Sequence, residues 1–157
     1  MRVVQAQDHD FEPWLELAGE AEPLFGPLVR DDRFLDALRK NIARGSAFCV
    51  RAGEGGAGTP LLGGLLWSAH PPKYEIGWLV VSTSSRRRGV ERALVEHALH
   101  TVKGSAVVAV NSFAEGFPGG EAALAFYQRL GFVACVAPLA EHEHGRQWFT
   151  LAESPRA

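Results

Sequence analysis

The chain has 157 residues, of which 46% are hydrophobic and 22% are charged. This length suits one compact domain with a sizeable core, so the composition excludes global disorder. The 16 Lys and Arg residues are balanced by 18 Asp and Glu residues, for a formal net charge of -2, which argues against a general nucleic-acid binder because such proteins are usually strongly basic.

The cysteines and the apolar runs of the sequence indicate the cellular compartment of the protein. Cys49 and Cys135 both lie in apolar runs, so we expect buried free thiols rather than a disulfide framework. No run approaches the ~20 apolar residues that span a bilayer, the beginning of the chain lacks a cleavable apolar leader, and no zinc-ligand spacing occurs. We therefore expect a cytoplasmic protein with no metal and no membrane partner.

The first half of the chain predicts two helices between strands. Residues 3–7 are typical of a strand, and residues 10–21 place apolar side chains at helical spacing. The segment "PLFGP" (23–27) predicts a break. Residues 31–45 predict a second helix that ends at Gly45, and residues 46–52 and 61–69 predict a hairpin around "GEGGAGTP".

The second half alternates strands and helices. Residues 74–83 predict a strand, residues 88–103 a helix with one apolar face, and residues 105–113 a strand buried on both faces. Residues 121–131 predict a short helix ending at glycine, and residues 132–137 and 146–152 predict a closing hairpin.

The resulting order is β-α-α-β-β-β-α-β-α-β-β. It predicts an α/β fold of the α+β type, in which a mixed, mostly antiparallel sheet of six to seven strands is flanked by about four helices in three layers. We expect a single domain over residues 1–157.

Three arginines, Arg86–Arg88, precede Gly89 where a strand leads into a helix. The first amides of a helix lack intrahelical acceptors, the helix dipole adds positive charge, and glycine allows close approach. These features predict a phosphate site, although neither GxxxxGK[ST] nor GxGxxG is present. A solvated helix start is one alternative, and nucleic-acid phosphate is another that would need a wider basic stripe.

Two motifs resemble the GNAT superfamily of acyl-CoA-dependent N-acetyltransferases. The run Arg86–Glu91 resembles the family's diphosphate loop, [RQ]-x-x-G-x-[GA], and "AALAFYQRLGF" (122–132) resembles its A-x-x-F-Y-x-x-x-G-F segment. The element order also matches the family fold. The resemblance implies acetyl-CoA as acyl donor and backbone amides at the end of the 74–83 strand that hold its tail. The implied cofactor-binding residues are Val80, Val81, Ser82, Arg86, Arg87, Arg88, Gly89, Val90, Glu91 and Arg92.

The chain departs from the family pattern at two positions. Glu91 stands where the family has Gly or Ala, and we expect it to turn away or to pair with Arg88 or Arg92, with Arg88 favoured. Gly120 stands where the family often has an asparagine near the pantetheine.

The resemblance also implies the catalytic groups. Glu75 shares a strand face with Gly77 and aligns with a glutamate that acts as general base in some members; an ordinary charged strand residue is the alternative. Tyr127 matches a tyrosine that faces the cofactor sulfur and donates a proton to the leaving thiolate; the alternative is a packing residue beside Phe126.

We therefore expect an N-acetyltransferase in which a primary amine, of a small molecule or a peptide, attacks acetyl-CoA directly in a ternary complex. A non-catalytic acyl-CoA-binding module on the same fold is the alternative, and a homodimer is left open. Acidic residues where the family binds its acceptor would attract a cationic amine; they are Glu20, Glu22, Asp31, Asp32, Glu141 and Glu143. His142 and His144 are interpreted as part of a solvated loop rather than as metal ligands.

Overall fold

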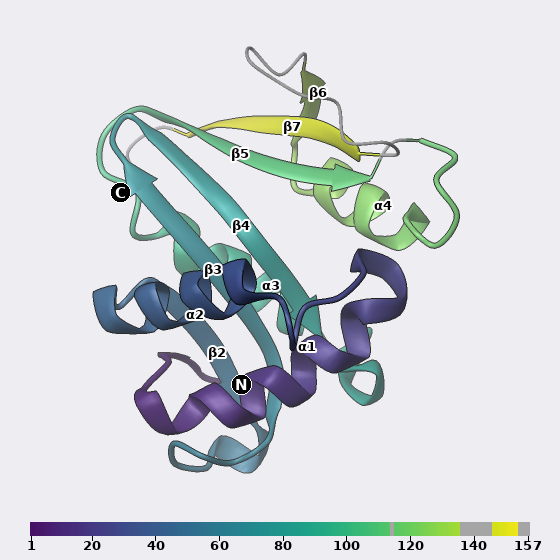
Figure 1. Cartoon of the computed structure of the whole chain (residues 1–157). Coiled ribbons are helices and arrows are strands. Elements are labelled where there is room, and N and C mark those ends of the chain that lie inside the picture. Colours follow the sequence, from purple (N-terminus) through teal and green to yellow (C-terminus); the bar gives the residue numbers. More distant parts are fainter. Residues whose placement is uncertain (114, 136–145, 154–157) are drawn as a thin grey trace. The chain divides into compact units, whose positions relative to one another are not determined.

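The computed structural model describes residues 1–113, 115–135 and 146–153 (Figure 1). The helices are α1 (Phe11–Phe25), α2 (Asp32–Arg44), α3 (Val90–Leu99) and α4 (Glu121–Arg129). The strands are β1 (Val3–Gln5), β2 (Ala47–Arg51), β3 (Leu61–His70), β4 (Lys73–Val81), β5 (Ala106–Phe113), β6 (Val133–Cys135) and β7 (Arg146–Glu153). Single 3-10 turns, η1 (Asp8–Asp10), η2 (Ala52–Glu54) and η3 (Thr83–Ser85), complete the described elements. The predicted order of strands and helices is confirmed.

The strands form a seven-stranded sheet in the order β1-β2-β3-β4-β5-β7-β6. The pairs β1–β2, β2–β3, β5–β7 and β6–β7 are antiparallel, whereas β4 and β5 run parallel. The predicted α/β fold with a mixed, mostly antiparallel sheet and four helices is therefore confirmed. By its contacts the chain divides into one unit of Met1–Trp67 with Trp78–Thr101 and a second of Ser68–Gly77 with residues 102–157. A single domain over residues 1–157 stays a prediction.

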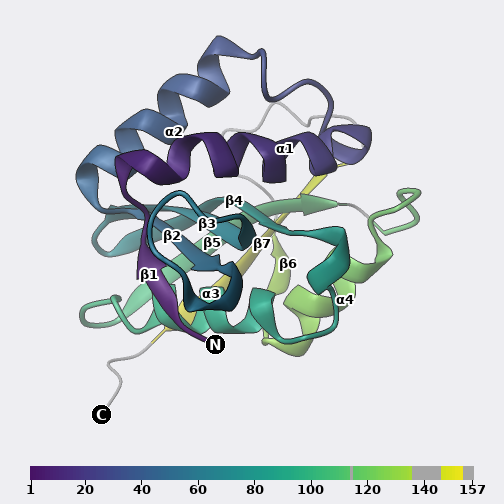
Figure 2. The same cartoon turned by 90° about the horizontal axis from the view of Figure 1, so that it is seen from below.

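In the first unit, helices cover both faces of the strands. Figure 2 shows α1 and α2 on one side and α3 on the other. Two adjacent glycines of β3 permit this close packing: a Cβ on Gly63 would lie 2.7 Å from Val90 of α3, and one on Gly64 would lie 2.7 Å from the ring of Trp14 of α1. Neighbouring residues of a strand face opposite sides, so the pair opens space for one helix on each face.

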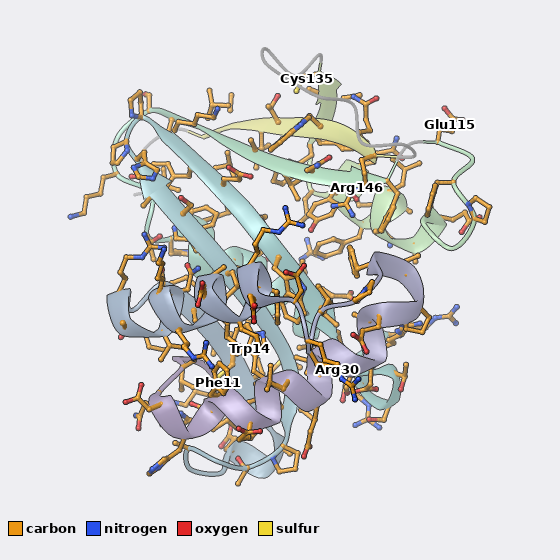
Figure 3. All side chains as sticks on the ribbon, viewed as in Figure 1. Phe11, Trp14, Arg30, Glu115, Cys135 and Arg146 are labelled. Carbon is orange, nitrogen blue, oxygen red and sulfur yellow. The ribbon has the colours of Figure 1, made fainter. Side chains whose placement is uncertain are left out.

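An aromatic cluster lies beneath α1 and α2. The rings of Trp14 and Phe34 each have centroids 5.6 Å from that of Trp78 on β4. Trp14 is labelled on α1 in Figure 3, and its side chain is completely buried. Burial of such large side chains supplies much of the hydrophobic stabilisation of this unit.

The second unit is organised around β5. This strand pairs with β7 along its whole length and with the beginning of β4, where Lys73–Ile76 lie beside Val107–Val110. The side chains of β5 are mostly buried, but Val107 is 45% exposed. The prediction that this strand is buried on both faces was therefore wrong at Val107. Other buried apolar residues of this unit are Tyr74, Ile76, Ala106, Val108, Ala109, Val110, Phe113, Tyr127, Phe132 and Phe149.

The break predicted at residues 23–27 is confirmed, but it begins only at Gly26, because α1 continues through Pro23 to Phe25. Proline removes only one amide donor there, in the last turn of the helix. The end of the helix is held instead by Gly26, which has φ +81° and donates its N–H to the Glu22 carbonyl at 2.8 Å. The helix therefore ends at a glycine rather than at the proline.

Helix α3 is shorter than the predicted range 88–103. It begins at Val90, after Gly89, and ends at Leu99. The His100 ring contacts the Glu96 carbonyl through Nδ1 at 2.6 Å, and the Thr101 hydroxyl donates to the Ala98 carbonyl at 2.6 Å. These side chains engage the last carbonyls of the helix and end it before Val102.

Both cysteines are free thiols, as predicted; Cys49 is buried, but Cys135 is only half-buried, so the burial predicted for it was wrong. Burial, with the nearby Asp10 charge, raises the pKa of Cys49 to about 12, against the opposing effect of Arg51. None of the helices in the described residues combines the length and apolar character needed to cross a bilayer.

Candidate functional site

The loop between β4 and α3 carries the predicted phosphate site. After η3, Arg86 is extended (φ -63°, ψ 149°), Arg87 takes φ +64°, and Gly89 takes φ +80° immediately before α3. Left-handed backbone is unusual for a residue other than glycine, so Arg87 marks a tightly turned segment. The chain therefore enters the helix through two left-handed residues.

Gly89 leaves the beginning of α3 open. A Cβ at this position would meet no atom within 4 Å, and no side chain caps the helix. The first helical hydrogen bond is donated by Ala93 to the Gly89 carbonyl, at 3.0 Å. The amides of Val90, Glu91 and Arg92 precede it and have no acceptor within the helix. This geometry suits an anionic group at the helix start.

The three arginines beside this opening are exposed. Among the ion pairs of the described residues none involves Arg86, Arg87 or Arg88. None of these pairs involves Glu91 either, and Arg92 pairs with Glu96 at 3.1 Å, so the alternative in which Glu91 pairs with Arg88 or Arg92 was wrong. The helix geometry explains this, since Glu96 lies one turn beyond Arg92 on the same face.

The end of β4 offers fewer free amides than the resemblance implies. The Ser82 N–H donates to the Leu62 carbonyl of β3 at 2.8 Å, so this amide is already engaged. Successive N–H groups of a strand point to opposite sides, so the Val81 N–H points away from β3 and the Val80 N–H points toward it. Within Val80–Ser82, only Val81 thus directs its amide away from β3.

A carboxylate on α1 anchors the beginning of the same loop. Glu20 Oε1 accepts hydrogen bonds from the Thr83 N–H at 3.0 Å and from the Thr83 hydroxyl at 2.7 Å. The Ser82 hydroxyl lies 2.9 Å from that of Ser85 and 3.3 Å from that of Ser84. No sequence signal predicts the Glu20 contact, since 63 residues separate the partners.

Glu75 lies on β4 in the second unit, opposite Ala109 of β5. Its neighbours Tyr74 and Ile76 are buried, whereas Glu75 is half-buried and Gly77 is exposed, which confirms the predicted alternation of faces. Burial raises the pKa of Glu75 above its ordinary value, and the nearby Lys73 charge opposes this only in part. A carboxylate with a raised pKa is suited to accept a proton near neutral pH.

Tyr127 is buried on α4 among aromatic rings. Its ring centroid lies 5.1 Å from that of Phe126 and 5.4 Å from that of Phe132, both at steep interplanar angles. Its carbonyl accepts the Phe132 N–H at 3.0 Å. The ring is therefore fixed by packing, which is compatible with either role considered for this residue.

Gly120, at the start of α4, packs directly on β5. A Cβ at this position would lie 2.5 Å from the Phe113 Cβ. The Phe113 ring is stacked on Phe117 and lies against the Arg146 guanidinium, whose Cζ is 4.7 Å from the ring centroid. The asparagine that the family often has here would need Phe113 to move.

Three of the six acidic residues expected to attract an amine already accept hydrogen bonds from the protein. Glu22 Oε2 accepts the N–H groups of Leu28 and Val29, at 2.8 and 3.3 Å, and Asp31 accepts the Arg33 N–H at 2.9 Å. With Glu20 bound to Thr83, three of the predicted acids shape loops and caps. Glu141 and Glu143 lie outside the described residues, as do His142 and His144. Within the described ranges, no three His, Cys, Asp or Glu side chains gather as a metal site.

The predicted residues thus fall into two groups. The residues assigned to the cofactor, Val80–Ser82 and Arg86–Arg92, belong to the first unit, and Glu75 and Tyr127 belong to the second. Their roles in cofactor binding and in catalysis stay predictions.

A strand that leads through a cationic glycine turn into a helix, within a mixed sheet, defines an α/β protein whose loop geometry suits an anion. The chain matches the model of the Acetyltransferase (GNAT) family over residues 9–132. It therefore belongs to the GNAT acetyltransferase family, and the resemblance inferred from its two motifs is confirmed.

Solved structures share this fold at low sequence identity. A GNAT-family acetyltransferase from Bacillus cereus has a TM-score of 0.72 at 13% identity, with 99% of this chain and 98% of that chain covered. The ribosomal-protein-S18-alanine N-acetyltransferase from Escherichia coli has a TM-score of 0.69 at 16% identity, with 99% and 96% covered. The PaiA N-acetyltransferase from Thermoplasma acidophilum, in complex with coenzyme A, has a TM-score of 0.69 at 11% identity, with 97% and 98% covered. A comparison with curated proteins gave no match.

Proposed function

We propose that this protein transfers an acetyl group from acetyl-CoA to a primary amine of a small molecule or a peptide. The observation that carries the proposal is the loop before α3, where exposed arginines without ion pairs in the described residues flank an open helix start. Cations at a helix N-terminus are locally unfavourable, so this arrangement calls for a bound anion. The diphosphate of coenzyme A is such an anion.

The residues present fit the cofactor. The amides of Val90, Glu91 and Arg92 are available to phosphate oxygens, and Gly89 leaves space for close approach. Arg86 and Arg88 would add charge-assisted hydrogen bonds. The Val81 N–H, directed away from β3, is available to the pantetheine end. The metal-free chemistry expected from the sequence stays a prediction.

Acetyl-CoA supplies an activated thioester when it is bound. Glu75 takes the proton of the acceptor ammonium, so that the neutral amine forms the new nitrogen–carbon bond as the carbon–sulfur bond breaks. The raised pKa of Glu75 suits this role. Tyr127 gives the proton of its hydroxyl to the departing thiolate, and the second proton of the acylated nitrogen returns to the Tyr127 oxygen as the amide forms. Attack is direct, within a ternary complex.

Two relatives support this choice of donor and acceptor. One acetylates the alanine amine of a ribosomal protein by its name, and another was solved with coenzyme A. We extend only the chemistry, an amine acceptor and a coenzyme A donor, to this chain. A cytoplasmic location and the absence of nucleic-acid and membrane partners remain part of the proposal.

A non-catalytic acyl-CoA-binding module is the second candidate, and Gly120 favours it. Phe113 occupies the space beside Gly120, so the family's asparagine contact is not available from this position. A module of this kind would bind the cofactor without turnover.

Titration with acetyl-CoA and a thiol-release assay over a panel of amines separate the two candidates. We expect binding together with release of coenzyme A for at least one amine, and strongly reduced turnover in Glu75→Gln and Tyr127→Phe with binding retained. Binding without turnover over the whole panel favours the module. No binding at all contradicts both candidates.

A further inference from the structure

We propose that Glu20 of α1 is a positioning residue for the diphosphate loop. This inference rests on the proposed function, because it concerns the loop to which coenzyme A is assigned. Glu20 would not touch the cofactor. It would hold the beginning of the loop in the conformation that presents the amides of α3 and the arginines.

Glu20 acts as a cap supplied from a distant helix. Thr83 is the first residue of η3, and Ser82 before it makes no side-chain capping bond. The Thr83 amide instead donates to Glu20 Oε1 at 3.0 Å, and its hydroxyl donates to the same oxygen at 2.7 Å. A carboxylate at the start of a helical turn satisfies an orphan amide and complements its dipole.

Few other hydrogen bonds join the loop to the rest of the unit, although Ser85 and Val90 are buried. Within the described parts of the chain, Glu20 makes the only side-chain hydrogen bonds that reach residues 82–91 from outside that segment. The serine contacts among Ser82, Ser84 and Ser85 are internal to it, and the Ser82 amide bond to Leu62 precedes η3. Beyond η3 the backbone passes through the left-handed residues Arg87 and Gly89. The position of η3 therefore sets where this turn begins.

Loss of Glu20 has two opposite effects on an anionic ligand. Removing the anchor frees the loop, which weakens binding because ordering it again costs conformational entropy. Removing the negative charge on its own reduces repulsion of the ligand, which strengthens binding. Glu20→Gln separates these effects, because its amide oxygen can still accept both Thr83 hydrogen bonds while the charge is gone.

The test measures coenzyme A affinity by calorimetry and acetyl-CoA KM and kcat by initial rates. We expect Glu20→Ala to weaken coenzyme A binding and raise KM by about five- to tenfold, with kcat changed much less. Glu20→Gln should remain within about twofold of the wild type. Glu16→Ala is the matched control. Glu16 is exposed one turn earlier on α1, and its side chain makes no hydrogen bond or ion pair in the described structure, so the coenzyme A affinity of this variant should be unchanged.

Two results would overturn the inference. If Glu20→Ala and Glu20→Gln both bind coenzyme A as tightly as the wild type, Glu20 has no effect on the loop. If both bind it more tightly, Glu20 acts only through its negative charge. Amide hydrogen exchange gives a readout without ligand or activity: residues 83–89 should exchange faster in Glu20→Ala than in Glu20→Gln. Equal exchange in both variants contradicts the anchor, whereas a wild-type protein that binds no coenzyme A contradicts the proposed function instead.

Discussion

Gly120 lies so close to Phe113 that a Cβ added to it would approach the Phe113 Cβ to 2.5 Å. Such a contact is far inside ordinary van der Waals separation, and Phe113 is itself fixed between Phe117 and Arg146. The glycine is therefore required by packing in the second unit. This requirement explains why glycine stands at position 120, where the family often has an asparagine; the sequence alone gives no reason for it.

Gly120→Ala should destabilise the protein by about 1–3 kcal/mol, because the added methyl group forces the β5 side chain or the start of α4 to move. Denaturant unfolding at neutral pH measures the change. Gly56→Ala is the control, since a Cβ there meets no atom within 4 Å, and its free energy of unfolding should stay the same or rise slightly. Equal stability of Gly120→Ala and the wild type would show that the contact relaxes freely.

A buried ion pair joins η1 to β2. Asp10 is fully buried and accepts hydrogen bonds from Arg51 Nε at 3.0 Å and Nη2 at 2.7 Å. Asp10→Ala should cost about 3–5 kcal/mol, because it leaves the guanidinium buried without its partner. Unfolding curves test this against Asp36→Ala, which breaks an exposed pair with Arg39 and should cost less than about 1 kcal/mol.

The same pair predicts a dependence of stability on pH. Burial raises the pKa of Asp10, but the Arg51 hydrogen bonds and charge and the amides of Gln7 and Gly58 outweigh it, so the pKa lies below its usual value. Asp10 therefore stabilises the fold above the ordinary carboxyl pKa and loses that contribution as pH falls toward the lowered one. In Asp10→Ala the free energy of unfolding should depend less on pH in this acidic range. If its decrease at low pH is the same as in the wild type, Asp10 does not cause the pH dependence.

The raised pKa of Glu75 predicts a different profile. A base must be ionised, so the acid limb of kcat/KM should lie above the ordinary glutamate pKa of about 4.3. Glu75→Gln should lower kcat about 10²- to 10⁴-fold. Because the folded pKa is raised, protonation of Glu75 stabilises the fold as pH falls, so Glu75→Gln should not destabilise it at neutral pH. A variant that keeps full activity would leave Glu75 as an ordinary strand residue.

Gly89 offers a test of the cofactor loop that separates charge from shape. Gly89→Asp places a carboxylate at the open helix start, and Gly89→Asn has the same shape and a similar tolerance of φ +80° without the charge. Coenzyme A should bind at least tenfold more weakly to the Asp variant than to the Asn variant. Equal affinities in calorimetry would place the diphosphate elsewhere.

Local patterns were sufficient to predict most of the fold. The apolar stripe of α2 and its stop at Gly45 agree with the structure, because both depend on neighbours within one helix. The break predicted over residues 23–27 begins at Gly26 rather than at Pro23, because the last turn of α1 tolerates the missing amide. The range of α3 was too long because His100 and Thr101 engage its final carbonyls, a competition that apolar periodicity does not report.

The site was only partly predictable for a related reason. The glycine turn and its arginines are contiguous, so the sequence displays them directly. The Glu20–Thr83 anchor, the Ser82–Leu62 hydrogen bond and the Gly120–Phe113 contact join residues that are separated along the chain. These contacts follow from strand order and helix packing, which single-sequence patterns do not determine.

A crystal structure with acetyl-CoA would show directly whether the loop before α3 binds the cofactor. We expect the diphosphate at the N-terminus of α3, with its oxygens bound by the amides that follow Gly89 and by the neighbouring arginines. Diphosphate density at any other part of the protein, or none at saturating ligand, would contradict it.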